Sequence, residues 1–158
     1  MWKRLRRFNS LDAEARGIFA RAAIVLPLIW LSLKFRGLRA TQESLQGRAF
    51  PRPTLPGRLE QSLSDAERLQ ITSRMVNAAV RHAWRPSTCL EKSLALWWSL
   101  RRQGLVSHIR IGARKINGKF EAHAWVERDG VAINDPQETH RHYAPFDPSL
   151  SSTLRETQ

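Results

Sequence analysis

The pattern of hydrophobic and polar residues predicts helices in the first two thirds of this chain and a small antiparallel sheet after them. The longest predominantly apolar run, Ala22 to Leu33, lies inside a segment that we interpret as one helix or two short ones, residues 10–36. We expect Pro27 to kink or divide this helix, because proline removes a backbone donor and clashes with the preceding turn. The segment presents an apolar surface that must pack against something.

A second helix is indicated between Ser64 and the "WRPST" segment. Ser64 and Glu67 have the spacing of a capping box, and apolar residues follow at helical intervals. The helix should end before Pro86, because residues that precede proline are pushed out of the helical region.

A third helix is predicted directly afterwards, with Thr88 as its N-cap and Glu91 completing a second capping box. This assignment makes Cys89 the first helical residue, and Gly104 marks the end of the helix. The side chains from Leu90 to Leu100 leave almost no polar face, which is typical of a helix buried on more than one side.

Beyond Gly104 the hydrophobic period changes to two, which predicts a β-hairpin. Asn117-Gly118 suits a two-residue type I′ turn that pairs Ile116 with Lys119. The resulting register pairs Ile109 with Val126, Ile111 with Ala124 and Ala113 with Ala122 on one face, and His108 with Glu127, Gly112 with His123 and Arg114 with Glu121 on the other. Gly112 should leave open space beside the His123 imidazole.

The second turn decides whether His123 can meet Asp135. We predict a three-residue loop, residues 128–130, with Gly130 in a G1 bulge and Glu127 paired with Val131. That loop places His123 and Asp135 opposite each other on one face, whereas a two-residue loop would place them on opposite faces. We choose the three-residue loop because it lets His123 meet Asp135, and the turn residues alone do not require it.

These elements predict an α+β fold in which a central buried helix packs against a small antiparallel sheet. We divide the chain into an N-terminal helical appendage (residues 1–46), a proline-rich linker (residues 47–62) and a core (residues 63–158). For the appendage, packing on the core of its own chain is favoured over a partner protein or a membrane surface.

Composition narrows the function classes. One cysteine among 158 residues excludes an internal disulfide, and we expect a cytoplasmic protein. The net charge of +12 favours acidic partners, but no zinc-finger spacing, RNA-binding signature or continuous basic helix supports nucleic-acid binding. The apolar run is shorter than the ~20 residues that span a bilayer. Asp12 and Glu14 argue against a cleaved signal peptide.

Cys89 is the candidate nucleophile, because a helix N-terminus stabilises a thiolate. The backbone amide of Cys89 could also hold an oxyanion. A nucleophile needs a base and a group that orients the base, and His123 and Asp135 fit these roles. The alternative is an inert buried thiol, since free cysteine is among the most buried residue types.

At these residues the chain resembles a known family. "CLEKSLALWWSLRRQG", "RIGARKINGKFEAHAWVERDG" and "IND" are similar to the transglutaminase-like cysteine proteases that mature lasso peptides, which are related to the microcin maturation protease. The similarity extends over roughly residues 85–136. It implies a transglutaminase-like or papain-like core and a triad of Cys89, His123 and Asp135, with no metal and no cofactor.

The resemblance also implies a substrate and partners. Members of that family remove the leader from a ribosomally made precursor peptide before a separate ATP-dependent macrolactam cyclase acts. Residues 1–84 lack the strand pattern of the leader-binding domain found in fused members. The chain therefore resembles the stand-alone protease, which works with a separate leader-recognition protein and with the cyclase.

Other interpretations stay open. The same three residues could perform transglutaminase-type acyl transfer or deamidation, or the chain could be a non-catalytic basic binding module. Trp125 shares the face of His123 and is either a shield for the site or a core residue. His140 and His142 have a spacing compatible with a metal, but without an evident third ligand we interpret them as loop residues.

Overall fold

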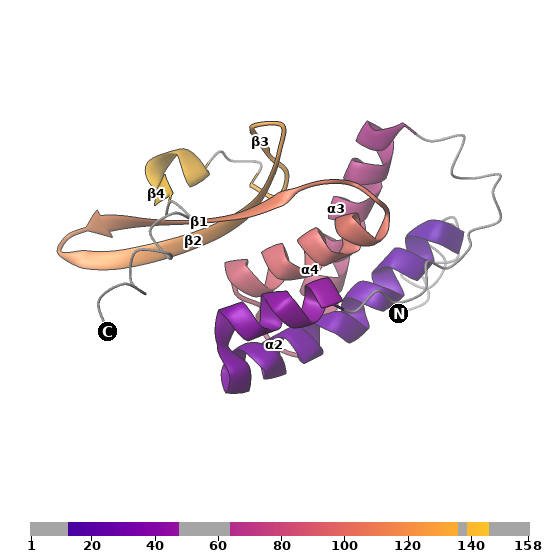
Figure 1. Ribbon diagram of the computed structural model, residues 1–158, viewed down its shortest axis with the longest axis horizontal. Coiled ribbons are helices and arrows are strands. Elements are labelled where there is room, and N and C mark those ends of the chain that lie inside the picture. Colours follow the sequence, from indigo (N-terminus) through magenta and orange to yellow (C-terminus); the bar gives the residue numbers. More distant parts are fainter. Residues whose placement is uncertain (1–12, 48–63, 136–138, 146–158) are drawn as a thin grey trace.

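The computed structural model describes residues 13–47, 64–135 and 139–145, and in this part of the chain three helices precede a curled antiparallel sheet (Figure 1). The helices are α2 (Ala13–Gly47), α3 (Asp65–His82) and α4 (Cys89–Arg102). The strands are β1 (His108–Ile116), β2 (Lys119–Arg128), β3 (Val131–Ala132) and β4 (Ala144–Pro145), in the order β3-β2-β1-β4, and a short 3-10 helix, η1 (Thr139–His142), precedes β4. The predicted α+β class is confirmed.

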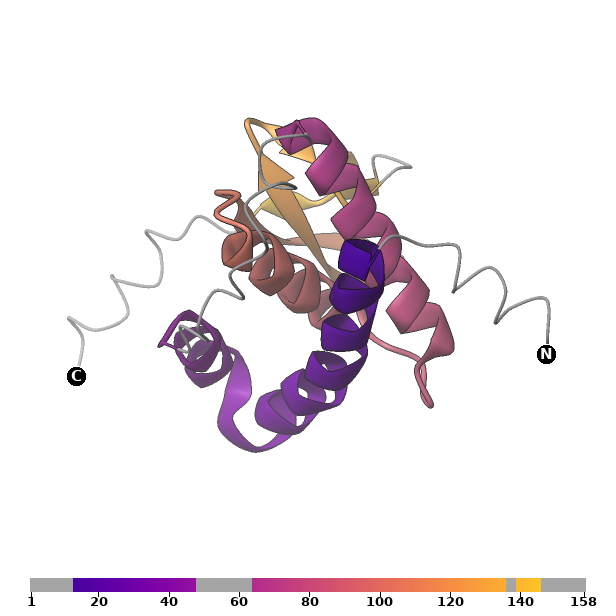
Figure 2. The ribbon, with the colours of Figure 1, turned by 90° about the vertical axis from the view of Figure 1, so that its right-hand side faces the viewer.

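The long helix α2 is a helical hairpin whose two arms are joined at Gly37 (Figure 2). Gly37 has φ 74° and ψ 178°, which glycine adopts without the penalty that a Cβ brings. Thr41 Oγ1 lies 2.8 Å from Ser32 Oγ, and this hydrogen bond ties the second arm to the first. The first arm continues through Pro27 with helical torsions, so the predicted division at Pro27 is wrong.

The helix survives Pro27 because tertiary packing holds both sides of it. Leu26 and Ile29 are buried in the same hydrophobic cluster as residues of α3, α4 and β2. The members of this cluster are Ala22, Val25, Leu26, Ile29, Val76, Ala79, Leu94, Ala95, Leu96, Trp97, Trp98, Leu100, Leu105 and Val126. Full burial of one such aliphatic side chain stabilises a fold by roughly 1.5–3 kcal/mol. One face of α2 therefore packs on the core of its own chain, as the sequence favoured.

The central position of α4 is also confirmed. It lies between α2 on one side and the sheet on the other (Figure 1), and Leu94, Leu96 and Leu100 are almost fully inaccessible to solvent. By length and composition, α2 is the one helix among the described residues that could cross a membrane, with a mean hydropathy of 1.8 over 18 residues. Packed core helices satisfy the same criteria, and the cytoplasmic location stays a prediction.

Both capping boxes form as predicted. The Glu67 amide donates to Ser64 Oγ and the Ser64 amide donates to Glu67 Oε2 at the start of α3. Thr88 and Glu91 make the same reciprocal pair at the start of α4, so Cys89 is the first helical residue. The proposed linker lies outside the described residues, apart from Gly47 at the end of α2.

The register of the first hairpin is confirmed at every predicted pair, from His108 with Glu127 to Ile116 with Lys119. The second turn is different from the prediction. Arg128 pairs with Val131, so the loop has two residues, Asp129 (φ 52°) and Gly130 (φ 77°). An Asp-Gly pair suits the type I′ turn that joins adjacent strands without a bulge. The three-residue loop was the wrong choice.

Candidate active site

Cys89 heads α4 with a half-buried thiol. The Thr88 side chain accepts from the Glu91 amide, and the Thr88 carbonyl accepts from the Lys92 amide. The amides of Cys89 and Leu90, which precede these two, have no acceptor among the described residues. Free amides at the positive end of a helix dipole are suited to hold a thiolate or an oxyanion.

An ion pair fixes the loop that enters α4. Arg85 Nη2 lies 2.7 Å from Oε1 of Glu91, whose carboxylate is buried. The Arg85 guanidinium also lies over the ring of Trp30 on α2, 4.9 Å from its centroid. The position of Cys89 is therefore supported from α2 as well as from its own helix.

His123 on β2 and Asp135 are brought together, with Nε2 and Oδ2 3.4 Å apart. This separation lies within ion-pair range but is too long for a good hydrogen bond, and the buried Nε2 has no other partner in the part of the chain that the structure describes. Nδ1 is the ring nitrogen left for another partner, although no hydrogen bond joins it to the Cys89 thiol among the described residues. In enzymes without substrate such bonds are often loose and tighten in the complex.

Asp135 reaches His123 by a route that the sequence did not predict. The strand β3 ends at Ala132, and the chain bends at Ile133 and Asn134 before it reaches the carboxylate. Because residues 133–134 bend, side chains after Ala132 no longer alternate between the two faces of the sheet. A continued strand would have placed Asp135 on the opposite face from His123. The predicted meeting of the two side chains occurs, but not through the predicted loop.

Asn134 fixes this bend between α4 and β2. Its Oδ1 accepts from the Val126 amide at 2.7 Å, and its Nδ2 donates to Ser93 Oγ at 2.9 Å. The Ser93 hydroxyl in turn donates to the carbonyl of Ala124 at 2.9 Å. All these polar groups are buried and paired, so the residue before Asp135 is held on both the helix of the thiol and the strand of the imidazole.

The short helix η1 holds the Asp135 carboxylate from the other side. Oδ2 accepts from the His140 amide at 2.5 Å and lies 3.1 Å from His140 Nδ1. Burial raises the pKa of Asp135, but hydrogen bonds from His140 and Thr139 lower it more, and the net pKa is below its ordinary value. The carboxylate is therefore ionised and stands between two imidazoles.

Aromatic side chains surround these imidazoles. The Trp125 indole stacks on His123 with ring centroids 6.0 Å apart and also contacts His140 at 5.6 Å. The Tyr143 ring also contacts His123, with ring centroids 5.2 Å apart. Trp125 is buried, and its Nε1 has no hydrogen-bond partner within residues 13–47, 64–135 and 139–145. The cluster shields the imidazole–carboxylate pair from water on the sheet side.

Gly112 does not leave the open space that the sequence suggested. A Cβ on Gly112 would lie 2.9 Å from the Ala144 carbonyl oxygen, 2.9 Å from Tyr143 Cβ and 3.1 Å from the Trp125 ring. The glycine therefore lets β4 and Tyr143 approach β1 closely, and it shapes the site through these neighbours.

Residues 31–146 match the family model described as the transglutaminase-like superfamily, and this segment is more than half of the chain. The chain belongs to the transglutaminase-like superfamily. No curated protein and no solved structure matches it. Enzymes of this superfamily are generally cysteine proteases or acyl transferases, and the matched segment contains Cys89, His123 and Asp135.

One cation of this transglutaminase-like domain lies near both ends of the candidate triad. Burial lowers the pKa of Lys92, while the charges of Asp135 and Cys89 raise it and that of Arg81 lowers it, with a net decrease. Lys92 is three residues after Cys89 on α4, and its ammonium group interacts electrostatically with both partners. Lys92 therefore places a half-buried positive charge near both the candidate nucleophile and the candidate acid.

Sequence reasoning missed the residues that position the acid. Thr139, His140 and Tyr143 belong to the "THRHY" segment, which we interpreted as a plain loop. His140 donates to Asp135 instead of pairing with His142, which is exposed. Among the described residues no three His, Cys, Asp or Glu side chains gather as a metal site. A turn signal directly after a candidate acid was the available clue.

Proposed function

We propose that this transglutaminase-like protein is a cysteine peptidase that removes the leader from a lasso-peptide precursor. The observation that carries the proposal is the ionised Asp135 facing Nε2 of His123, in a domain whose one cysteine heads α4. This order of Cys89, His123 and Asp135 agrees with the lasso-peptide proteases that the "CLEKSLALWW" and "AHAWVE" motifs resemble. The resemblance supports the substrate class, and the geometry supports the chemistry.

The proposed reaction begins at the thiol. His123 Nδ1 takes the proton of Cys89, and the sulfur forms a bond to the scissile carbonyl carbon at the end of the leader. The carbonyl oxygen becomes an oxyanion, which the free amides of Cys89 and Leu90 can hold. Asp135 stabilises the imidazolium that forms and keeps its ring in position.

Collapse of the tetrahedral intermediate completes the acylation. Nδ1 of His123 returns the proton to the leaving core-peptide amine, the C–N bond breaks, and the leader remains on sulfur as a thioester. A water molecule then loses a proton to His123 and forms a bond to the thioester carbon. The C–S bond breaks, and the leader leaves as a carboxylate. The reaction needs no metal and no nucleotide.

The resemblance supports three further parts of this proposal. The precursor would be presented by a separate leader-recognition protein, and an ATP-dependent macrolactam cyclase would act on the released core peptide. A cytoplasmic location fits a ribosomally made substrate. The net charge of +12 suits acidic polypeptide partners, whereas nucleic-acid binding has no supporting motif.

Acyl transfer is the second candidate, favoured by the acyl transferases of the same superfamily. The same thioester would be formed from a glutamine side chain or a peptide carbonyl, and an amine instead of water would take the acyl group. Deamidation would result if water attacked a thioester formed from glutamine. The products of these reactions differ in mass from those of peptide hydrolysis.

The deciding experiment incubates the full chain with precursor and recognition protein, followed by mass spectrometry. Two fragments whose summed mass equals precursor plus one water would support the peptidase. A precursor whose mass rises by that of the amine minus one released ammonia would instead support transfer from glutamine, and a rise of about one mass unit would support deamidation. The matched control is Cys89→Ala, which removes the nucleophile, and intact precursor with the unchanged chain would contradict the proposal.

A further inference from the structure

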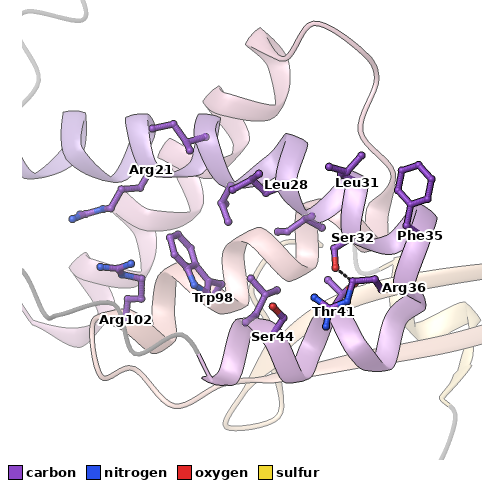
Figure 3. A pocket seen from close by; sticks show the side chains of 14 residues that line it. Arg21, Leu28, Leu31, Ser32, Phe35, Arg36, Thr41, Ser44, Trp98 and Arg102 are labelled. Carbon is purple, nitrogen blue, oxygen red and sulfur yellow. Dashed lines mark hydrogen bonds between the residues drawn. The ribbon is translucent and has the colours of Figure 1, made fainter.

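The two arms of α2 and the last turns of α4 enclose a groove of about 550 Å³ (Figure 3). Its walls carry the side chains of Ile24, Leu28, Leu31 and Phe35, which are between 46% and 73% exposed although they are large and apolar. The indole of Trp98 lies at its base. This is a concave apolar surface on a protein that packs the opposite face of the same helix into its core.

Positive charges stand at both ends of the groove. Arg21 and Arg102 lie together at one end, and Arg36 lies at the other (Figure 3). Burial lowers the pKa of Arg102, and the neighbouring charge of Arg21 lowers it further. No acidic side chain lines the groove among the described residues. An anion at this end of the groove would be attracted by both guanidinium groups.

We propose that this groove binds an acidic amphipathic helix of a partner protein. The apolar stripe of the incoming helix would lie on Leu28, Leu31 and Phe35, and carboxylates near its two ends would pair with Arg21 and Arg36. The two arginines are 15 residues apart on one helical arm, which corresponds to about 20 Å, or four turns of a bound helix. A helix seated between two helical arms above a third completes a bundle.

The arrangement of charges distinguishes this occupant from others. A single-chain lipid carries its negative charge at one end, whereas this groove has cationic groups at both ends. A second copy of the chain would bring another +12 charge to the surface. Two segments outside the described residues are also basic: residues 1–12 carry four basic side chains against Asp12, and residues 48–63 carry three against Glu60. Residues 146–158 carry Asp147 and Glu156 against Arg155, which leaves one net negative charge for a groove with arginines at both ends.

The groove is separate from the candidate active site. Trp98 and Arg102 belong to the end of α4 opposite Cys89, and 13 residues of helix between Cys89 and Arg102 correspond to about 20 Å. Binding at the groove therefore neither needs nor blocks the thiol. The inference goes beyond the proposed peptidase activity and would stand if that activity were absent.

The test is fluorescence anisotropy of the full chain with a labelled 16-residue helical peptide. This peptide carries leucines at positions i, i+3, i+4 and i+7 and glutamates near both ends, and a matched peptide has lysine in place of each glutamate. We expect the glutamate peptide to bind at least ~10-fold more tightly than the lysine peptide. Leu28→Glu and Arg21→Glu should each weaken its binding at least ~10-fold.

Matched control variants introduce glutamate at exposed positions outside the groove. Phe120→Glu changes an exposed apolar residue on the β-hairpin, and Arg74→Glu changes an exposed arginine on α3. Both should bind the glutamate peptide like the unchanged chain. Circular dichroism checks the fold of each variant, and Arg36→Glu replaces Leu28→Glu if the latter fails to fold. Equal affinity in groove and control variants, or no binding by the unchanged chain, would overturn the proposal.

Two further measurements identify other occupants. Cosedimentation with vesicles containing phosphatidylserine, lost in Leu28→Glu while the peptide does not bind, would assign the groove to a membrane surface. Light scattering that shows a dimer broken by Leu28→Glu would assign it to a second copy. Either result would overturn the assignment to an acidic helix.

Discussion

The two ends of α4 present surfaces of opposite kind. At its beginning, the capping box, the Glu91–Arg85 ion pair and the Ser93–Asn134 hydrogen bond satisfy polar groups in defined directions. At its end, Trp98 and Arg102 face an open groove with apolar walls and like charges. Hydrogen bonds fix atoms to within a fraction of an ångström, as bond-making chemistry requires. Apolar contacts are not directional, so an exposed apolar surface can bind a partner whose position varies slightly.

The difference shows how one buried helix can support two separate tasks. Leu94, Leu96 and Leu100 are buried between the two ends of α4. Because the two ends are far apart, we expect a substitution at one end to leave the function of the other end unchanged. The predictions below test this separation by changing one end at a time.

Cys89→Ala should have the largest effect and should act on the first end alone. We expect leader removal to fall by at least ~10⁴-fold, because the covalent intermediate can no longer form. Precursor cleavage followed by mass spectrometry measures the loss. The melting temperature and the affinity for the acidic peptide should stay unchanged, and full activity in this variant would contradict the peptidase proposal.

Gly112→Val should damage the sheet beneath the site. The new side chain would press on the Ala144 carbonyl and on Tyr143, so β4 must move away from β1. We expect unfolding in urea to show a loss of about 1–3 kcal/mol, together with reduced cleavage. Gly17→Val is the control on α2, where an added Cβ meets only the flexible Arg21 side chain. Equal losses in both variants would contradict the role given to Gly112.

His140→Ala should change the acid sensitivity of the fold. The pKa of Asp135 is lowered in the folded chain, so its contribution to stability is complete above the ordinary value of 3.8 and is lost as the pH falls through the lower, folded value. Removing His140 deletes one donor and raises that pKa toward 3.8, so the variant should lose less stability on acidification, and the loss should be complete at a higher pH. Thermal melting between pH 2 and pH 5 measures the shift.

The exposed neighbour His142 provides the control for this experiment. His142→Ala removes a similar side chain from the same 3-10 helix without touching the carboxylate. Identical acid profiles for the two variants would show that His140 does not hold Asp135.

Gly37→Ala should have the smallest effect on cleavage and should act on the second end alone. The combination of φ 74° and ψ 178° is almost restricted to glycine and costs another residue about 1–3 kcal/mol, although no atom of the described residues lies within 4 Å of the added Cβ. We expect a lower melting temperature and weaker binding of the acidic peptide, because the arms of α2 meet at this residue. Gly47→Ala is the control, and cleavage should be unchanged in both variants.

Rules that use neighbouring residues predicted the helices and strands of this fold more successfully than the places where the chain changes direction. Both capping boxes and the first hairpin register follow from residues that are neighbours in sequence or across one tight turn. A kink or division of the helix was expected at Pro27, whereas the helix is interrupted at Gly37, because single-sequence rules weigh the proline but not the core that packs around it.

The site was predicted in part for the same reason. Cys89 lies at the predicted helix start, and His123 lies on the predicted strand face, since both depend on periodicity. The support of Asp135 by His140 and Asn134 depends on a bend and a 3-10 turn, which no period encodes. The requirement that acid and imidazole meet was useful, but it led to the wrong loop.

The hydrogen bond between the Val126 amide and Asn134 Oδ1 makes it possible to measure whether the candidate site is folded. The Val126 amide is on the central strand of the sheet, yet its acceptor is a side-chain oxygen on the segment that carries Asp135. Amide hydrogens exchange with deuterium only when their bond opens. Slow exchange at the Val126 amide would thus show that the bend beside Asp135 is closed. Exchange at neighbouring amides of β2 would report the hydrogen bonds between the strands. A single backbone signal can be followed in the resting protein without substrate.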